Sequence, residues 1–352
     1  GERIALLEAE MKNLEPRMTE LVLAMPNIPD PDVPEGGEEA NLEVSKWGGP
    51  PTFDFTPRPH WELMKGVFDP EAAGVIAGSS FVLLRGWAAG LQRRLIGWMV
   101  ENHLRAGMEE VWPPFLACRD SVTATGQLPK LADDMYLLER DDLFLIPTGE
   151  VSITNLYRGA TLRESDLPVK LCGYTPCFRR EAGSYGKDTR GLNRVHQFEK
   201  VEMVWLTHPE ESHRAHEAML AQATGLLEKL GLHYRVVLLA AGDLSFSAAR
   251  CYDLEIWSPG QMKWLEVSSV SNCRDFQARR GNIRFKPSGG GKPAFVHTLN
   301  GSGLALPRLM AALVETWQRP DGTVDVEGLS SRLVIPQEGR APQEQPDHSV
   351  YR

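Results

Sequence analysis

Apolar residues recur at a regular spacing through the first 25 residues of the chain. The steps alternate between three and four residues, as in the seam of a coiled coil. The positions are Ile4, Leu7, Met11, Leu14, Met18, Leu21 and Met25. This pattern predicts a helix that requires a partner helix, which no other segment of the sequence supplies, and Pro16 should kink it. The alternative is a helix that lies against a globular core.

Two longer segments also have the spacing of amphipathic helices. Within residues 81–107 the apolar positions are Leu91, Leu95, Trp98 and Met99. Within residues 211–231 they are Met219, Ala223, Leu226, Leu227 and Leu230. Pro113 and Pro114 follow the first of these segments and bias their predecessors away from helix. Residues 111–115 are therefore expected to be extended.

A strand is predicted where the period of the pattern changes to two. Val195, Gln197, Glu199 and Val201 alternate with His196, Phe198, Lys200 and Glu202. The preceding residues, 178–194, are rich in glycine, arginine and lysine. Strand, loop and strand together predict a hairpin whose arginines can bind an anion. The alternative is a surface hairpin with solvated charges.

Composition narrows the class of protein. The chain has 352 residues and a hydrophobic fraction of 42%, enough for one large catalytic domain or two smaller ones. Its 38 basic and 47 acidic residues give a net charge of −9, so contact with a nucleic acid would need local basic patches. The five cysteines form no Cys-x-x-Cys pair, and neither a long apolar run nor a signal peptide is visible. We expect a cytoplasmic protein with reduced cysteines and no membrane partner.

The segment most informative about chemistry spans residues 178–202. It reads Phe-Arg-x-Glu-Ala-Gly-Ser, then Gly-Lys-Asp-x-Arg-Gly-Leu, then Arg-x-His-Gln-Phe and Lys-Val-Glu. This order resembles motif 2 of the class II aminoacyl-tRNA synthetases and is most similar to the bacterial type of the seryl-tRNA synthetase family. Residues 298–308 resemble motif 3 of the class. The helix, extended segment and Pro114 resemble motif 1.

The resemblance implies an α+β fold and a division of the chain. Residues 49–340 would form the class II catalytic domain, a mixed and mostly antiparallel sheet flanked by helices, and motif 1 would build a homodimer. Residues 1–25 are similar to the end of an N-terminal helical arm, residues 26–48 to its proline-rich linker, and residues 341–352 would be a tail. Because the chain begins with Gly1, we expect a processed or partial gene product that lacks most of the arm.

The resemblance also implies which residues bind ATP. Arg179 would bridge the substrate carboxylate and the α-phosphate, and Arg194 would reach the terminal phosphates. Glu181 would accept a hydrogen bond from the adenine amino group, with Phe198 on one face of adenine and Arg308 on the other. The implied catalysis is electrostatic, because both reactants are anions whose repulsion has to be screened.

A magnesium site is implied by the segment Glu-x-x-Ser at residues 266–269. Glu266 and Ser269 would be ligands of Mg²⁺, a cation that prefers oxygen atoms and retains water. Together with Arg179 and Arg308, Glu266 would complete the catalytic set. The alternative is that Glu266 merely faces solvent. The sequence shows no set of zinc ligands, so we expect no zinc-dependent serine site.

Serine would be recognised by a small polar pocket. By resemblance, Thr148 and Glu202 would hold the ammonium group, and Glu202, Asn300 and Ser302 would surround the hydroxyl. Glu150 belongs to the same Thr-x-Glu loop as Thr148, and Arg179 would bind the carboxylate. A pocket that hydrogen-bonds a hydroxyl rejects analogues without it by about 10⁴-fold, which would exclude alanine and glycine.

The implied activity is a serine–tRNA ligase. Serine and Mg-ATP would give seryl-adenylate and pyrophosphate, and the serine would pass to the 3′ end of tRNA(Ser); charging of selenocysteine tRNA is left open. One alternative is an armless paralogue that adenylates serine for another acceptor. Another is a catalytically dead interaction protein, against which the intact Arg179, Glu202, Glu266 and Arg308 argue.

Overall fold

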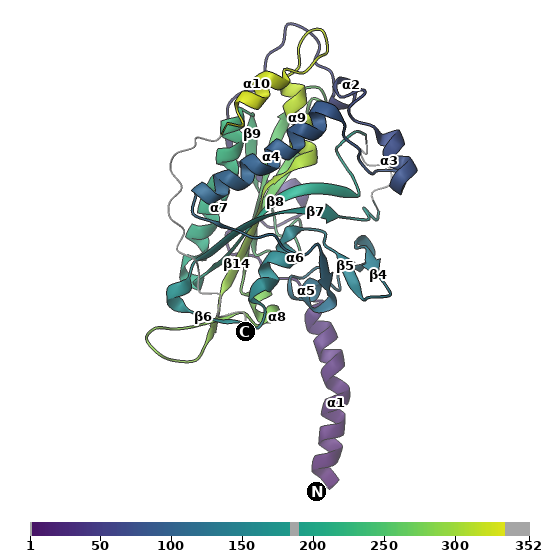
Figure 1. Ribbon diagram of the computed structural model, residues 1–352. Coiled ribbons are helices and arrows are strands. Elements are labelled where there is room, and N and C mark those ends of the chain that lie inside the picture. Colours follow the sequence, from purple (N-terminus) through teal and green to yellow (C-terminus); the bar gives the residue numbers. More distant parts are fainter. Residues whose placement is uncertain (1, 184–189, 335–352) are drawn as a thin grey trace.

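The computed structural model describes residues 2–183 and 190–334, and its centre is an eight-stranded sheet (Figure 1). Within this sheet all neighbouring strands are antiparallel except β2 and β7, which are parallel. This confirms the prediction of a mixed, mostly antiparallel sheet. In spatial order the strands are β1 (Leu42–Trp47), β9 (Tyr234–Leu238), β10 (Arg250–Ser258), β11 (Lys263–Arg274), β14 (His297–Ala305), β8 (Gln197–Thr207), β7 (Val169–Phe178) and β2 (Glu109–Glu110).

Three long helices cover one face of this sheet and form the main core with it. They are α4 (Gly86–Arg105), α7 (Ser212–Leu230) and α9 (Leu306–Thr316). The predicted apolar faces of α4 and α7 are buried, as expected. Helix α4 begins at Gly86 and not at residue 81, because Leu84 and Arg85 pair by their backbones with Phe68 and Val67.

Shorter elements complete the molecule. Two small sheets have the orders β13 (Ala294–Phe295), β12 (Arg284–Lys286), β6 (Thr161–Arg163) and β3 (Leu116–Cys118), β5 (Leu143–Leu145), β4 (Leu137–Leu138). The short helices are α2 (His60–Leu63), α3 (Pro70–Ala77), α5 (Arg119–Ala124), α6 (Gly149–Thr154), α8 (Phe276–Gly281) and α10 (Val326–Ser331). Among them, α2 packs against α9 and α10 packs against α4. Single 3₁₀ turns are η1 (Glu38–Ala40), η2 (Ala132–Asp134), η3 (Asn155–Tyr157), η4 (Glu164–Asp166) and η5 (Pro209–Glu211).

The N-terminal helix α1 (Glu2–Leu23) projects from the body of the molecule (Figure 1). Its seam residues are between 52% and 62% exposed, which confirms the unpartnered stripe and shows that a helix lying against the core is wrong. The helix runs without interruption through Pro16. Among the described residues no helix is both long and apolar enough to cross a membrane.

The segment after α1 lies along the body. The Asn27 amide donates to the Phe246 carbonyl at 2.9 Å, and Asp30 forms an ion pair with Arg274 at 2.5 Å. Residues 42–47, which the family resemblance assigned to the linker, form β1 at the edge of the main sheet. All six are exposed, so the strand has no buried face, and the alternation of apolar and polar residues is confined to its first four positions.

Candidate functional site

A cavity of about 770 Å³ opens on the sheet face that α4, α7 and α9 leave uncovered. Strand alternation explains its lining, because Lys200 and Glu202 of β8 face the cavity whereas Val201 and Met203 face the core. All twelve residues that the sequence assigned to the site line this one cavity. They are Thr148, Glu150, Arg179, Glu181, Arg194, Phe198, Glu202, Glu266, Ser269, Asn300, Ser302 and Arg308.

The predicted hairpin is present as β7 and β8, paired antiparallel from Val169 opposite Leu206 to Phe178 opposite Gln197. Arg179 follows β7 directly. Its Nε donates to the carbonyl of Pro147 at 3.2 Å, and its guanidinium lies 5.2 Å from the centre of the Phe198 ring. These two contacts fix the guanidinium at the cavity wall. Residues 184–189 of the predicted motif lie outside the described residues.

Glu181 and Arg194, from opposite sides of the hairpin loop, bind one another. The Arg194 guanidinium donates to a Glu181 carboxylate oxygen at 2.6 Å. Glu181 has φ of +52°, a left-handed conformation that costs a non-glycine residue roughly 1–2 kcal/mol. For these side chains to contact adenine and phosphate, as the resemblance implies, their ion pair would have to open.

A bulge in β11 places Glu266 and Ser269 on the same face of the strand. Glu266 lies opposite Glu255 and Ser269 opposite Asp253, so one extra residue separates the two positions on β11. Without the bulge, residues three apart would point to opposite faces. The Ser269 hydroxyl donates to Glu266 at 3.2 Å. Arg308 donates to the Glu266 carbonyl at 3.1 Å, which joins motif 3 to this group.

These oxygen donors fit a magnesium ion. Burial, followed by the charge of Glu266, raises the pKa of the neighbouring Asp253 to about 8. A cation at this position would relieve that repulsion. Among the described residues no three His, Cys, Asp or Glu side chains are grouped to hold a metal by themselves. Phosphate and water oxygens would therefore have to complete the coordination, as is usual for Mg²⁺.

The opposite end of the cavity is a closed hydrogen-bonded pocket. The Thr148 hydroxyl donates to Glu202 at 3.0 Å and accepts from the Lys200 ammonium at 2.7 Å, and Lys200 also forms an ion pair with Glu202. Thr148 is the N-cap of α6, where its hydroxyl accepts from the Glu150 amide. Thr148 and Glu202 are both buried, so their orientation is set before any ligand arrives.

Glu150 of α6 also belongs to this pocket. One of its carboxylate oxygens accepts from the Gln277 amide and, at 2.9 Å, from the Asn300 amide. Burial, followed by the nearby charge of Glu202, raises the pKa of Glu150 to about 7. Ser302 lies opposite Glu202 in the β14–β8 register. The pocket therefore presents hydroxyl, amide and carboxyl groups to a small polar ligand.

Comparison with known proteins decides the family. Residues 136–317 match the family model of the tRNA synthetase class II core domain (G, H, P, S and T). The serine–tRNA ligase of Nitratidesulfovibrio vulgaris strain Hildenborough is 53% identical over 330 residues, which are 93% of this chain and 78% of that protein. That of Thermomicrobium roseum is 52% identical over 93% of this chain and 74% of that protein. The chain belongs to the seryl-tRNA synthetase family.

Solved structures of seryl-tRNA synthetases agree with the fold. The Pyrococcus horikoshii enzyme complexed with ATP has a TM-score of 0.90 at 36% identity, over 94% of this chain and 80% of that one. The cytoplasmic Naegleria fowleri enzyme in complex with AMP has a TM-score of 0.86 at 30% identity, over 93% and 79% of the two chains. The predictions of the family, the fold class and an aminoacyl-tRNA ligase are confirmed.

In this seryl-tRNA synthetase, three residues of the cavity network were missed by the sequence analysis: Lys200, Asp253 and Gln277. Lys200 could have been found, because the predicted alternation puts it on the same strand face as Phe198 and Glu202. Asp253 and Gln277 had no such signal. Their positions depend on β10 lying beside β11 and on α8 reaching Glu150.

Proposed function

We propose that this chain activates L-serine with Mg-ATP and transfers it to tRNA(Ser) in the cytoplasm. One observation carries the proposal: Arg179 and Arg308, from distant segments, share a cavity with the polar pocket around Thr148, Glu202 and Asn300. In the first step the serine carboxylate attacks the α-phosphorus of ATP, and pyrophosphate leaves. In the second step a 3′-terminal hydroxyl of the tRNA attacks the carbonyl of the adenylate, and AMP leaves.

The proposed ATP site uses the arginines for charge and geometry. Arg179, held against Phe198 and Pro147, binds the serine carboxylate and the α-phosphate together. Each charge-assisted hydrogen bond of this kind contributes roughly 1.5–3 kcal/mol. Arg194 and Arg308 neutralise the departing pyrophosphate, and adenine lies near Glu181. Glu266 and Ser269 would hold Mg²⁺, which supplies further positive charge at the phosphates.

The proposed serine site uses direct hydrogen bonds and no zinc. Glu202, Thr148 and Glu150 receive the ammonium group, while Asn300 and Ser302 bind the hydroxyl. Lys200 already donates to Thr148 and pairs with Glu202, so the serine ammonium has to displace Lys200 or share the Glu202 carboxylate with it. An added ammonium would also favour loss of the proton from Glu150, whose pKa is about 7.

Serine-dependent exchange of pyrophosphate into ATP tests the first step, with alanine, threonine and cysteine as competitors. We expect exchange with serine and discrimination of about 10⁴-fold against alanine. ATP binding without exchange would contradict the proposal and favour an interaction protein. Charging of tRNA(Ser) and of selenocysteine tRNA tests the second step. Exchange without charging of either tRNA would favour a non-tRNA acceptor, although the exposed seam of α1 supports a tRNA-binding arm.

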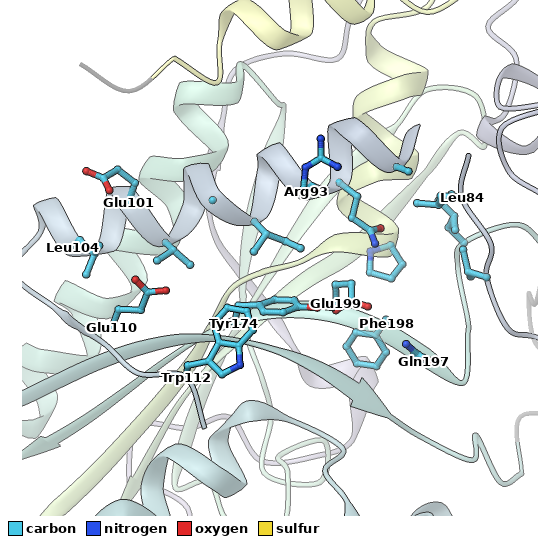
Figure 2. A pocket seen from close by; sticks show the side chains of 18 residues that line it. Leu84, Arg93, Glu101, Leu104, Glu110, Trp112, Tyr174, Gln197, Phe198 and Glu199 are labelled. Carbon is cyan, nitrogen blue, oxygen red and sulfur yellow. Dashed lines mark hydrogen bonds between the residues drawn. The ribbon is translucent and has the colours of Figure 1, made fainter. Parts of the chain in front are cut away.

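A second copy of the chain is the proposed occupant of a groove beneath α4. The groove has a volume of about 720 Å³, and Figure 2 shows Trp112, Tyr174 and Phe198 below the helix. Trp112 is 69% exposed, and Arg93, Glu101 and Glu110 line the groove with charges of both signs. A two-fold partner can match apolar and charged groups of this kind.

The groove and the catalytic cavity share Phe198 in their linings, so dimerisation should influence the site. Sedimentation velocity of Trp112→Glu tests the homodimer. We expect a shift toward monomer, with Ile28→Glu as the control, since Ile28 is an apolar residue of the linker segment that is 80% exposed. A variant that sediments like the parent would contradict this interface.

The division of the chain is proposed with one adjustment. Residues 1–25 are proposed to belong to a helical arm, and the catalytic body follows the linker. The body is proposed to begin with β1 at Leu42, because that strand pairs with β9. The proposed tail, residues 341–352, lies outside the described residues.

A further inference from the structure

The return side of the catalytic loop is attached to a buried imidazole. His60, the first residue of α2, is fully buried, as is Glu315 of α9. The Leu192 amide donates to His60 Nε2 at 2.9 Å, and His60 Nδ1 lies 2.9 Å from a Glu315 carboxylate oxygen. Neither His60 nor Glu315 lines the cavity, whereas Leu192 does.

The partners define the protonation of the ring. A backbone amide only donates, so Nε2 has to offer its lone pair to Leu192. A carboxylate only accepts, so the proton of a neutral imidazole lies on Nδ1. Glu315 is itself held by the His60 amide at 2.9 Å, the Gly260 amide at 3.1 Å and the Ser258 hydroxyl. The ring therefore has one orientation.

The contact between ring and loop is close. A Cβ atom added to Gly191, which has φ of +68°, would lie 2.1 Å from His60 Nε2. Asn193, which follows Leu192, is tied to the same cluster. Its side-chain amide donates to Gln261 at 2.8 Å, and Gln261 donates to Glu315. Arg308 donates through Nε to the Asn193 carbonyl at 3.0 Å. Arg194 is the residue directly after Asn193 in the chain.

We propose that His60 is a positioning residue for ATP. By accepting the Leu192 amide, it fixes the backbone that orients Arg194 and supports Arg308, while Glu315 keeps the ring in the required tautomer. This inference rests on the proposed roles of Arg194 and Arg308. A small displacement of a positioned charge can cost about 10²-fold in rate. Since Arg194 and Arg308 are assigned to ATP, the loss of activity should appear in the kinetics with ATP and not in those with serine.

Kinetics of His60→Ala test the proposal. We expect KM for ATP in pyrophosphate exchange to rise by roughly 10-fold, with KM for serine changed by less than about two-fold, and faster hydrogen exchange at the Leu192 amide. His60→Gln, which retains an acceptor near Nε2, should restore most of the affinity for ATP. His233→Ala, which removes a buried ring bonded to the Trp47 carbonyl, is the control for stability.

Several outcomes would overturn the assignment. A folded His60→Ala with an unchanged KM for ATP would do so, as would equal changes in both KM values. If His60→Ala does not fold, Glu315→Leu decides, because a leucine side chain cannot accept from His60 Nδ1. A folded Glu315→Leu with the parental KM for ATP would overturn the proposal. Arg194→Ala and Arg308→Ala, measured in the same assay, separate a failure of the proposed ATP site from a failure of the His60 inference. If neither alters the use of ATP, the proposed site roles fail independently of His60.

Discussion

The two ends of the cavity differ in how they are held. At the serine end, Glu202 and Lys200 have side chains only 1% and 8% exposed, and each is bonded to Thr148. At the ATP end, Glu266, Arg308 and Arg194 are 44%, 30% and 29% exposed. Buried polar groups are costly to leave unpaired, whereas exposed charges are screened by water. Selectivity should therefore depend on the closed end, and the open end can rearrange around a large anion.

Arg179 lines the cavity next to Phe198 and the Pro147 carbonyl, and its removal should have the largest effect. Arg179→Ala is expected to slow serine-dependent pyrophosphate exchange by about 10²–10³-fold, because it loses charge stabilisation in the transition state. Arg119→Ala is the matched control, since Arg119 also lies over an aromatic ring, that of Phe144, at 5.1 Å, but outside the cavity. Equal losses in the two variants would contradict the assignment.

Glu202→Gln tests the closed end alone. It removes the buried charge that faces Thr148 and Lys200 and leaves the Lys200 ammonium without its carboxylate. We expect KM for serine to rise by roughly 10²-fold, while KM for ATP changes little. Steady-state exchange with each substrate varied in turn measures both constants. A larger effect on ATP than on serine would show that the two ends are not separable.

Glu266→Gln tests the open end in the same assay. We expect the Mg²⁺ concentration for half-maximal exchange to rise by about 10-fold, with KM for serine unchanged. The effect should be smaller than that of Glu202→Gln because Glu266 is partly hydrated. Glu228→Gln is the control, because the Glu228 carboxylate accepts from the Tyr234 hydroxyl and does not line the cavity. An unchanged Mg²⁺ requirement would contradict the proposed ligand.

The pH dependence of stability should report the raised pKa of the buried Glu150. The folded-state pKa of Glu150 is raised from its ordinary 4.5 to about 7, so above pH 4.5 the folded state retains a proton that the unfolded state has lost. Stability therefore falls as the pH rises from about 4.5 to 7. Glu150→Gln should remove this loss. As the pH rises from about 4.5 to 7, the melting temperature of the variant relative to the parent should therefore increase by a few degrees. A pH-independent difference would refute the raised pKa.

Gly149→Ala should give the smallest effect, confined to the serine end. A Cβ at Gly149 would lie 3.0 Å from the Thr175 hydroxyl and 3.1 Å from the Glu202 Cβ. We expect KM for serine to rise by roughly two- to five-fold and KM for ATP to stay constant. Gly225→Ala is the control, since nothing lies within 4 Å of that helical position and alanine favours the helix. A tighter serine KM would indicate that the pocket can relax.

Local patterns predicted a large part of the molecule. The alternation in residues 195–202 correctly predicted β8 and the face that carries Phe198 and Glu202. The spacing of three and four predicted α1 and its exposed seam. Prediction was wrong at the start of α4, because a backbone bridge to Phe68 leaves no hydrophobic periodicity. It missed β1, because the alternation of Leu42 and Val44 with polar residues is interrupted at a bulge and the strand has no buried face.

The sequence by itself determined the chemical groups, their order and the faces of regular strands, because alternation is a property of neighbouring residues. Only the tertiary structure decided that Glu266 and Ser269 share a face, since that depends on a bulge against β10. It also decided the raised pKa of Glu150 and the attachment of Leu192 to His60. Burial and hydrogen-bond partners come from residues distant in the chain, and no local pattern contains them.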